Sequence, residues 1–172
     1  MNSSDKSTRG NASQFFIAGE LCRRGLVASV TLDNTPNTDI LCSNVEGTRF
    51  AHIQVKTYNP SRLGAVGIVP LGKKAEIDFG DNFFWVLGGI PDPDNDHPFS
   101  YYVIPSSVMA KEISEDHALW LSGTKRDGSA RQDSSLRSIL LPPRRTRTGW
   151  SIAEYFERWD LIVNSLDNIR NR

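Results

Sequence analysis

The sequence predicts a single α/β domain in which a mixed central sheet is flanked by helices. Three features predict this class: an apolar helical pattern ending at Gly25, two β-rich segments within 38–57, and helical patterns near 106–121 and 151–167. A chain of 172 residues, 38% hydrophobic and 23% charged, is long enough to bury a sizeable core in one domain.

The overall charge excludes a general attraction to nucleic acid. The formal net charge is zero and the pI is about 6.8, so any such attraction must come from a local patch. Cys22 and Cys42 lie among apolar neighbours in a chain without an evident secretory leader, and we expect both to be reduced and buried. Since no apolar run has the length of a membrane span, we expect a cytoplasmic protein with no membrane contact. We also expect no organic cofactor.

The N-terminal region predicts a helix after a short tail. Residues 1–10 are small and polar without periodicity, so we expect a disordered tail, with one domain over 11–172. Asn11 or Ser13 is a suitable N-cap, and Gly25 follows Arg23 and Arg24 as a suitable C-terminal stop.

Three strands are expected next. The segment 26–32 is short and mostly apolar, as a central strand should be. The segments 38–44 and 48–57 are rich in β-branched and aromatic residues, and the dipeptide 46–47, Glu-Gly, offers a tight turn between them. An antiparallel hairpin is therefore predicted.

The register of this hairpin follows from its turn. With a two-residue loop, positions that sum to 93 face each other, and Asp39 lies opposite Gln54. Side chains alternate along a strand, so one face of the second strand is apolar and the other carries Phe50, His52, Gln54 and Lys56.

These polar residues carry a resemblance. A helix with Glu20, an Asp-Ile pair at Asp39 opening a strand, and Gln54-Val-Lys56 on the next strand resemble the core of the PD-(D/E)xK, or restriction-endonuclease-like, nuclease superfamily. The pattern is similar in particular to the Mrr-like and Holliday-junction-resolvase branches, in which Gln can replace the second acid. Two departures are that Thr38 stands where the family has Pro, and that Gln54 removes one negative charge from the metal site.

The resemblance implies a Mg²⁺-dependent (or Mn²⁺-dependent) deoxyribonuclease whose partner is DNA, with a homodimer as a possible assembly. By position, Asp39, Gln54 and Glu20 would be metal ligands, and Lys56 and Glu20 would be catalytic. Mg²⁺ prefers oxygen ligands and takes few carboxylates from the protein, which suits this set. Lys56 would stabilise charge in the transition state of phosphodiester hydrolysis.

Each of these residues also has a purely structural interpretation. Glu20 and Arg24 are spaced for a surface ion pair on a helix, and Asp39 could cap a turn. Gln54 and Lys56 could form the solvated side of a half-exposed strand. Asp33, in the loop after the first strand, is a reserve ligand, although a turn explains it as well.

The middle of the chain is less regular. Residues 60–81 hold several glycines and predict loops around short strands, whereas the superfamily core would place a helix there. Lys73 and Lys74 could contact phosphate, although a solvated loop is the simpler interpretation. Segments 82–90 and 100–105 predict a strand pair, followed by a helix over 106–121.

A basic segment follows at 123–149. It is poorly periodic and has a local excess of five positive charges, which predicts nucleic-acid contact or, alternatively, a merely soluble loop. The predicted contacts are Lys125, Arg126, Arg131, Arg137, Arg144, Arg145 and Arg147.

The C-terminal region 150–172 predicts a helix. Ser151 with Glu154 forms a capping box, Trp150 and Tyr155 are placed as its hydrophobic staple, and the apolar face is suited to close the core or to form a homodimer seam.

The predicted function is therefore that of a metal-dependent DNA endonuclease. Two alternatives remain open on the sequence: a catalytically inactive nucleic-acid-binding module of the same fold, and a protein-interaction subunit whose arginines meet an acidic protein.

Overall fold

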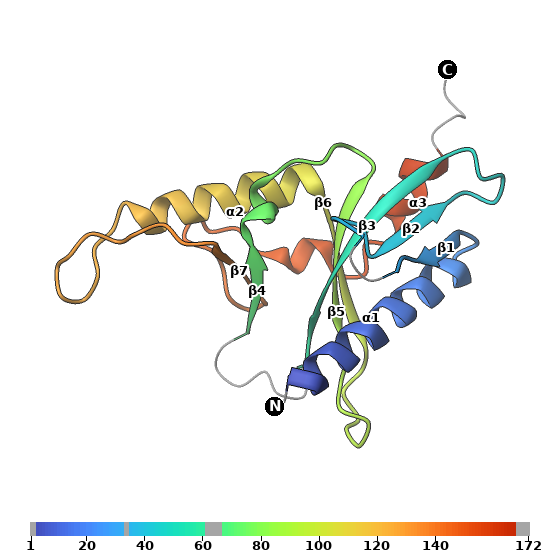
Figure 1. The fold of residues 1–172 in the computed structure, drawn as a ribbon, viewed down its shortest axis with the longest axis horizontal. Coiled ribbons are helices and arrows are strands. Elements are labelled where there is room, and N and C mark those ends of the chain that lie inside the picture. The colour runs from blue at the N-terminus through green and yellow to red at the C-terminus, as the bar shows by residue number, and fades with distance from the viewer. Residues whose placement is uncertain (1–2, 33–34, 61–66, 168–172) are drawn as a thin grey trace.

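The computed structural model describes residues 3–32, 35–60 and 67–167. Figure 1 shows a central sheet with helices on both of its faces and a smaller two-stranded sheet beside it. The elements are, in chain order, α1 (Ser3–Arg23), β1 (Val27–Val30), β2 (Ile40–Ser43), β3 (Phe50–Tyr58), β4 (Ile68–Gly72), η2 (Lys73–Glu76), β5 (Phe83–Gly89), β6 (Ser100–Pro105), α2 (Ser106–Leu121), β7 (Leu136–Leu140), η3 (Ile152–Tyr155) and α3 (Asp160–Asp167).

The main sheet has five strands in the order β1-β2-β3-β5-β6. Only β3 and β5 run parallel, and the other neighbours are antiparallel. A parallel pair needs a crossover connection, and here the crossover passes through β4 and η2 instead of a long helix. The predicted class, a mixed central sheet flanked by helices, is confirmed.

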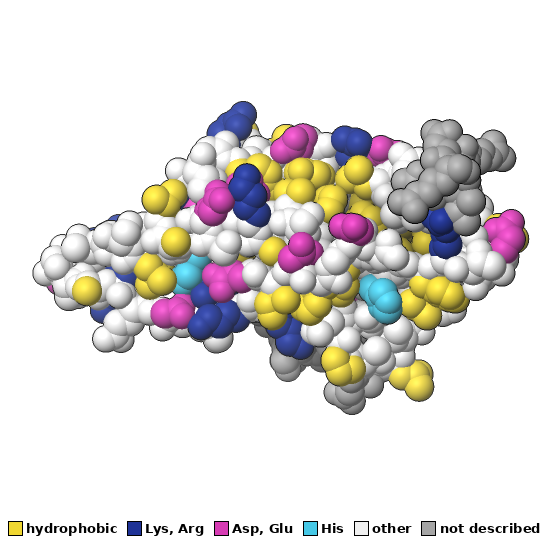
Figure 2. Space-filling view, turned by 90° about the horizontal axis from the view of Figure 1, so that it is seen from above, with side chains coloured by type: hydrophobic (Ala, Val, Ile, Leu, Met, Phe, Trp, Pro, Cys, Tyr) yellow, Lys and Arg dark blue, Asp and Glu magenta, His cyan; other side chains and the backbone are white. Residues whose placement is uncertain are grey.

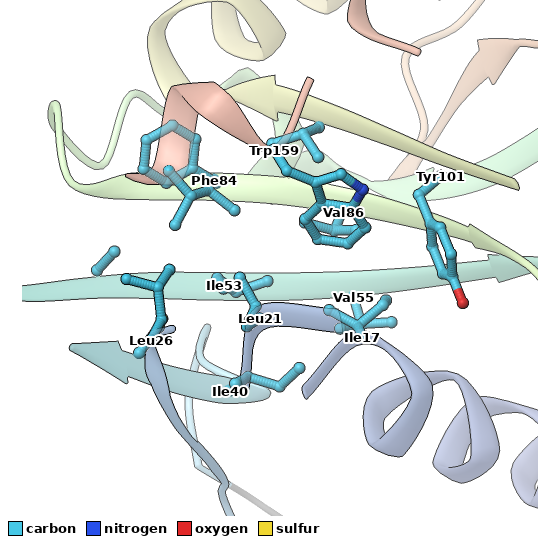
Figure 3. Packing of buried hydrophobic residues seen from close by; sticks show 14 of the residues in the cluster. Ile17, Leu21, Leu26, Ile40, Ile53, Val55, Phe84, Val86, Tyr101 and Trp159 are labelled. Carbon is cyan, nitrogen blue, oxygen red and sulfur yellow. The ribbon is translucent and has the colours of Figure 1, made fainter. Parts of the chain in front are cut away.

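One face of the main sheet is covered by α1 and α3, and we call it the α1 face. Ile17 and Leu21 of α1 pack here against Ile53 and Val55 of β3, with Trp159 closing the cluster (Figure 3). These side chains are buried, as the predicted apolar side of β3 requires.

The opposite face carries Gln54 and Lys56, and we call it the α2 face. Over β5 and β6 it is covered by α2 and by the small antiparallel sheet of β4 and β7. Trp85 and Leu87 are buried beneath this second layer, whereas Phe50 and His52 on β3 are exposed. The second layer thus ends at β3.

The β2–β3 register agrees with the prediction. Ile40 pairs with Ile53 and Leu41 with His52, so paired positions sum to 93. The turn itself is longer than two residues, because Asn44 N–H bonds the Arg49 carbonyl and Gly47, at φ 64°, closes a turn onto Asn44. Glu is poorly suited to the first place of a tight hairpin turn, and the longer loop preserves the register.

The N-terminal helix begins at Ser3, so the expected loose tail is helical over most of its length. Arg9 explains part of this extension, because its guanidinium donates to the Ile90 carbonyl at 2.8 Å and to Asp92 at 2.6 Å. Ser13, a predicted N-cap, is instead fully buried inside the helix. Long-range contacts of this kind have no signature in local sequence.

The C-terminal helix is interrupted. Ser151 caps η3 through its hydroxyl, which accepts from Ala153 N–H, but the chain becomes extended at Phe156, and Glu157 follows with a φ of 53°. The Glu157 carboxylate accepts from Tyr101 N–H at 3.0 Å and from Trp159 Nε1 at 2.7 Å. The Glu157 N–H also donates to the Tyr101 carbonyl at 2.9 Å, so two bonds to the edge strand β6 replace the helical turn. The helix α3 then buries Ile162 and Leu166 in the core, as core closure predicts.

Both cysteines are free, as expected, but only Cys42 is buried and Cys22 is exposed. Within the described parts of the chain, no helix has the length and apolar character needed to cross a membrane.

Candidate active site at the start of β2

Asp39 and Gln54 are brought together by the β2–β3 pairing. Gln54 Nε2 donates a hydrogen bond to Asp39 Oδ2, and the backbone N–H of Val55 donates to the same oxygen at 2.6 Å. The Asp39 main chain is held on both sides, by the Ile53 carbonyl at 2.9 Å and by Thr31 N–H at 3.0 Å. The carboxylate is therefore fixed by the sheet itself.

Lys56 lies on the same face as Gln54, two residues further along β3. Both side chains are half-buried, between the exposed His52 and the buried Tyr58. The positive charge of Lys56 acts on the Asp39 carboxylate and favours its ionised form. The three residues form one polar site at the border where the second layer ends.

Burial sets the protonation of Asp39. Desolvation raises the pKa of this carboxyl above its usual range, and the Val55 N–H, the Lys56 charge and the Gln54 amide only partly oppose it. A divalent cation or another positive group would stabilise the ionised form further. This carboxyl is thus suited to bind a cation, with a proton as the competitor.

Glu20 does not join this site. Its helix lies on the α1 face, whereas Asp39, Gln54 and Lys56 lie on the α2 face. Its carboxylate borders a surface hollow with Tyr101 and Glu157, at the β6 edge of the sheet, and three strand spacings of about 4.8 Å separate β6 from β2. The expected shared metal position is not formed.

Glu20 is instead the centre of an ion-pair group. It bonds Arg23 Nη2 at 2.9 Å and Arg24 Nη1, and Arg24 lies over the Trp159 ring at 4.7 Å. The hydrogen bond from Arg23 is the largest cause that lowers the pKa of Glu20 below its ordinary value. The predicted role of Glu20 as ligand and catalytic acid is corrected to a structural ion pair at helical spacing.

The donors present are compatible with a sparsely coordinated hard cation. Asp39 offers a carboxylate and Gln54 an amide oxygen, and Mg²⁺ commonly takes only one or two protein groups and keeps several waters. Within residues 3–32, 35–60 and 67–167 there is no group of three or more His, Cys, Asp or Glu side chains able to hold a metal ion. Asp33, the reserve candidate, lies outside the described residues.

The basic segment is more structured than expected, because β7 lies within it. Arg137 points inward from β7, and its side chain is 2% exposed and pairs with Glu76 at 2.5 Å and Asp133 at 3.1 Å. This buried guanidinium cannot reach nucleic acid, so its predicted contact is corrected. An inward-facing arginine also explains why the strand pattern was missed.

The other predicted contacts lie in different surroundings. Arg131 lies over the Trp120 ring at 5.1 Å and donates to the Trp120 carbonyl at 2.7 Å, and Arg147 pairs with Asp116 at 2.6 Å. Lys125 and Arg126 are exposed in the loop after α2, drawn in orange, which projects away from the main sheet in Figure 1. Arg144 and Arg145 are exposed in the loop that follows β7, where Arg145 donates to the Gly149 carbonyl at 3.0 Å.

Charges on the face drawn in Figure 2 are dispersed. On the face drawn in Figure 2, Lys and Arg side chains stand apart from one another, and several lie beside Asp or Glu. This agrees with the zero net charge and restricts any attraction for a polyanion to local positions.

Two neighbours of the site make contacts that were not predicted from the sequence. Thr38 Oγ1 lies 3.2 Å from His52 Nδ1, and Lys74 Nζ donates to Asn37 Oδ1 at 2.7 Å. Strand alternation already placed His52 on the face of Gln54. The proximity of Lys74 to this loop has no local signal, because Lys74 comes from η2 in the second layer.

Comparison with solved structures identifies the architecture. The bacterial homing endonuclease I-Ssp6803I is similar over 97% of this chain and 96% of its own, with a TM-score of 0.55 and 18% sequence identity. The chain has the restriction-endonuclease-like fold. Hjc, a Holliday junction resolvase from Archaeoglobus fulgidus, matches over 81% of this chain and 96% of its own, with a TM-score of 0.39 and 15% identity. No family model matches the sequence, and no curated protein matches it.

Proposed function

We propose that this protein is a divalent-metal-dependent DNA endonuclease of the PD-(D/E)xK type, close to the Mrr-like branch with a Gln-x-Lys motif. The observation that carries the proposal is the meeting of Asp39, Gln54 and Lys56 on one sheet face, two of them joined by a hydrogen bond. The fold shared with a homing endonuclease adds support. A cytoplasmic location and a possible homodimer are part of the same proposal.

Each residue has a role that its chemistry permits. Asp39 and the Gln54 amide oxygen would hold Mg²⁺ or Mn²⁺, which would polarise a phosphoryl oxygen and lower the pKa of water. Lys56 would stabilise the negative charge that develops on the phosphoryl group during in-line attack. The Val55 N–H keeps the Asp39 carboxylate in place throughout.

The exposed lysine and arginine side chains of the basic segment 123–149 would bind the DNA phosphates. The exposed cations are Lys125, Arg126, Arg144, Arg145 and Arg147. Arg147 would have to leave Asp116, and Arg131 would have to leave Trp120, to contact a phosphate. Contacts to phosphates release counterions, so affinity should fall steeply with salt and depend little on base sequence.

The test is plasmid nicking with Mg²⁺, Mn²⁺ or EDTA by the wild type, Asp39→Asn and Lys56→Met. Nicking that needs a metal and is lost in both variants supports the endonuclease. Equal nicking by the wild type and both variants contradicts it.

One observation favours a second candidate. Among the described residues, Asp39 supplies the one carboxylate of the site, because Gln54 is neutral and Glu20 lies on the other face. A DNA-binding module without turnover would bind duplex DNA in a salt-sensitive manner, unaffected by Mg²⁺ or Mn²⁺. A protein-interaction subunit would not bind DNA even at low salt.

A further inference from the structure

Lys74 brings a second cation to the chain segment that leads into Asp39. Its Nζ donates to Asn37 Oδ1 at 2.7 Å. Asn37 is two residues before Asp39, and two Cα–Cα steps of about 3.8 Å limit the separation of their Cα atoms to about 7.6 Å. Lys74 therefore belongs to the neighbourhood of the candidate active site, although it is distant in sequence.

The other side chains of η2 are held elsewhere. Lys73 Nζ bonds Asp133 at 2.8 Å, Ala75 is fully buried, and Glu76 pairs with the buried Arg137. These anchors fix η2 on the small sheet. Lys74 is the η2 side chain that bonds to the loop before β2, and its direction is set by the anchors around it.

Asn37 is suited to hold this lysine without neutralising it. Its backbone has φ 63°, a left-handed conformation that Asn tolerates better than most residues. Its amide oxygen is uncharged, so the bond to Lys74 is weaker than a bond to a phosphate oxygen would be. The Lys74 ammonium group can therefore leave the Asn37 amide oxygen and bind a phosphate oxygen.

The charge balance of the site favours an anion. Among the described residues of this neighbourhood, Asp39 contributes one negative charge, while Lys56 and Lys74 contribute two positive charges. A phosphodiester group supplies the missing negative charge, and each contact to it releases a counterion.

We propose that Lys74 is a second phosphate-binding residue of this site, held by Asn37 in the free protein and transferred to a phosphodiester oxygen of bound DNA. This inference rests on the proposed function for its ligand. It names a residue from the second layer, outside the Asp39–Gln54–Lys56 set.

The experiment measures binding of a fluorescein-labelled DNA duplex by anisotropy, in EDTA, at several salt concentrations. Lys74→Gln should bind about tenfold more weakly and show a slope of log K against log salt smaller by about 0.9. Lys74→Arg should restore the slope. Lys73→Gln, the matched control one residue away, should keep the wild-type slope.

A second variant separates a binding role from a structural one. Asn37→Gly removes the acceptor of Lys74, keeps the lysine charge and tolerates the positive φ of this position, so it should bind DNA as well as the wild type or more tightly. If Lys74 only braced the loop, Asn37→Gly and Lys74→Gln would weaken binding alike, and that result would overturn the proposal.

The outcomes also separate this inference from the proposed function. Salt-dependent binding by the wild type with an unchanged slope in Lys74→Gln removes the role of Lys74 alone. Binding without cleavage, with the smaller slope in Lys74→Gln, removes the endonuclease and keeps the phosphate contact. A wild type that does not bind the duplex overturns both. Where the wild type cleaves, Lys74→Gln should raise KM more than it lowers kcat.

Discussion

Asp39 Oδ2 accepts a hydrogen bond from the backbone N–H of Val55 at 2.6 Å. Val55 is the residue between Gln54 and Lys56, and its side chain points into the core on the α1 face. The carboxylate is thus attached to the main chain of the strand that carries the other two site residues. The position of the Asp39 carboxylate is consequently set by the β2–β3 pairing.

The raised pKa of Asp39 predicts that the free energy of unfolding falls as pH rises. The native state holds this proton more tightly than the unfolded state does, so native stability falls as pH rises from about 3.9 towards the raised value. Asp39→Asn cannot ionise and escapes this loss. Urea unfolding at pH 3, 5 and 7 should show the variant gaining stability relative to the wild type as pH rises, and parallel curves would disprove the assignment. Mg²⁺ at pH 7 should stabilise the wild type and not the variant.

Lys56→Met should lower the cleavage rate by about 10²–10³-fold, because it removes a charge directed at the transition state. Binding of duplex DNA in EDTA should weaken much less. Lys111→Met, on the exposed side of α2, is the control and should leave both quantities unchanged. Single-turnover cleavage is the appropriate measurement, and near-wild-type rates for Lys56→Met would argue against its role.

Glu20→Gln should cleave DNA within about threefold of the wild type, because its carboxylate lies on the opposite face of the sheet from Asp39. The ion pairs with Arg23 and Arg24 are partly exposed, and their loss should lower the free energy of unfolding by less than about 1 kcal/mol. Glu46→Gln, at the exposed hairpin turn, serves as the comparison. A hundredfold loss of cleavage in Glu20→Gln alone would place Glu20 in the active site after all.

Arg137→Ala should lower the free energy of unfolding by about 2–3 kcal/mol, because it leaves the partly buried Glu76 without its partner. Exposure of Glu76 and Asp133 keeps the effect below that of a fully buried pair. The urea midpoint gives the measurement, with Arg126→Ala in the projecting loop as the control. Equal midpoints for the two variants would refute a structural role for Arg137.

The sequence by itself determined the hairpin and its register. Asp39 faces Gln54, and Lys56 shares their face, because side-chain alternation has a period of two and the turn limits the possible pairings. Apolar periodicity also located α1, α2 and the burial of Trp159. These features depend on residues that are close together in the sequence, so the local pattern of apolar and polar residues predicts them.

Only the tertiary structure decided which face each element covers. The helical pattern places Glu20 at a suitable spacing but does not say that it lies against β6, three strands from Asp39. The inward-facing Arg137 breaks the alternation of apolar and polar residues that would have predicted β7. The bonds of Glu157 to the edge of the sheet divide the last helix. Lys74 reaches Asn37 only because buried contacts hold η2 on the second layer. Such contacts join residues far apart in the chain, and their free energy depends on packing that no local pattern encodes.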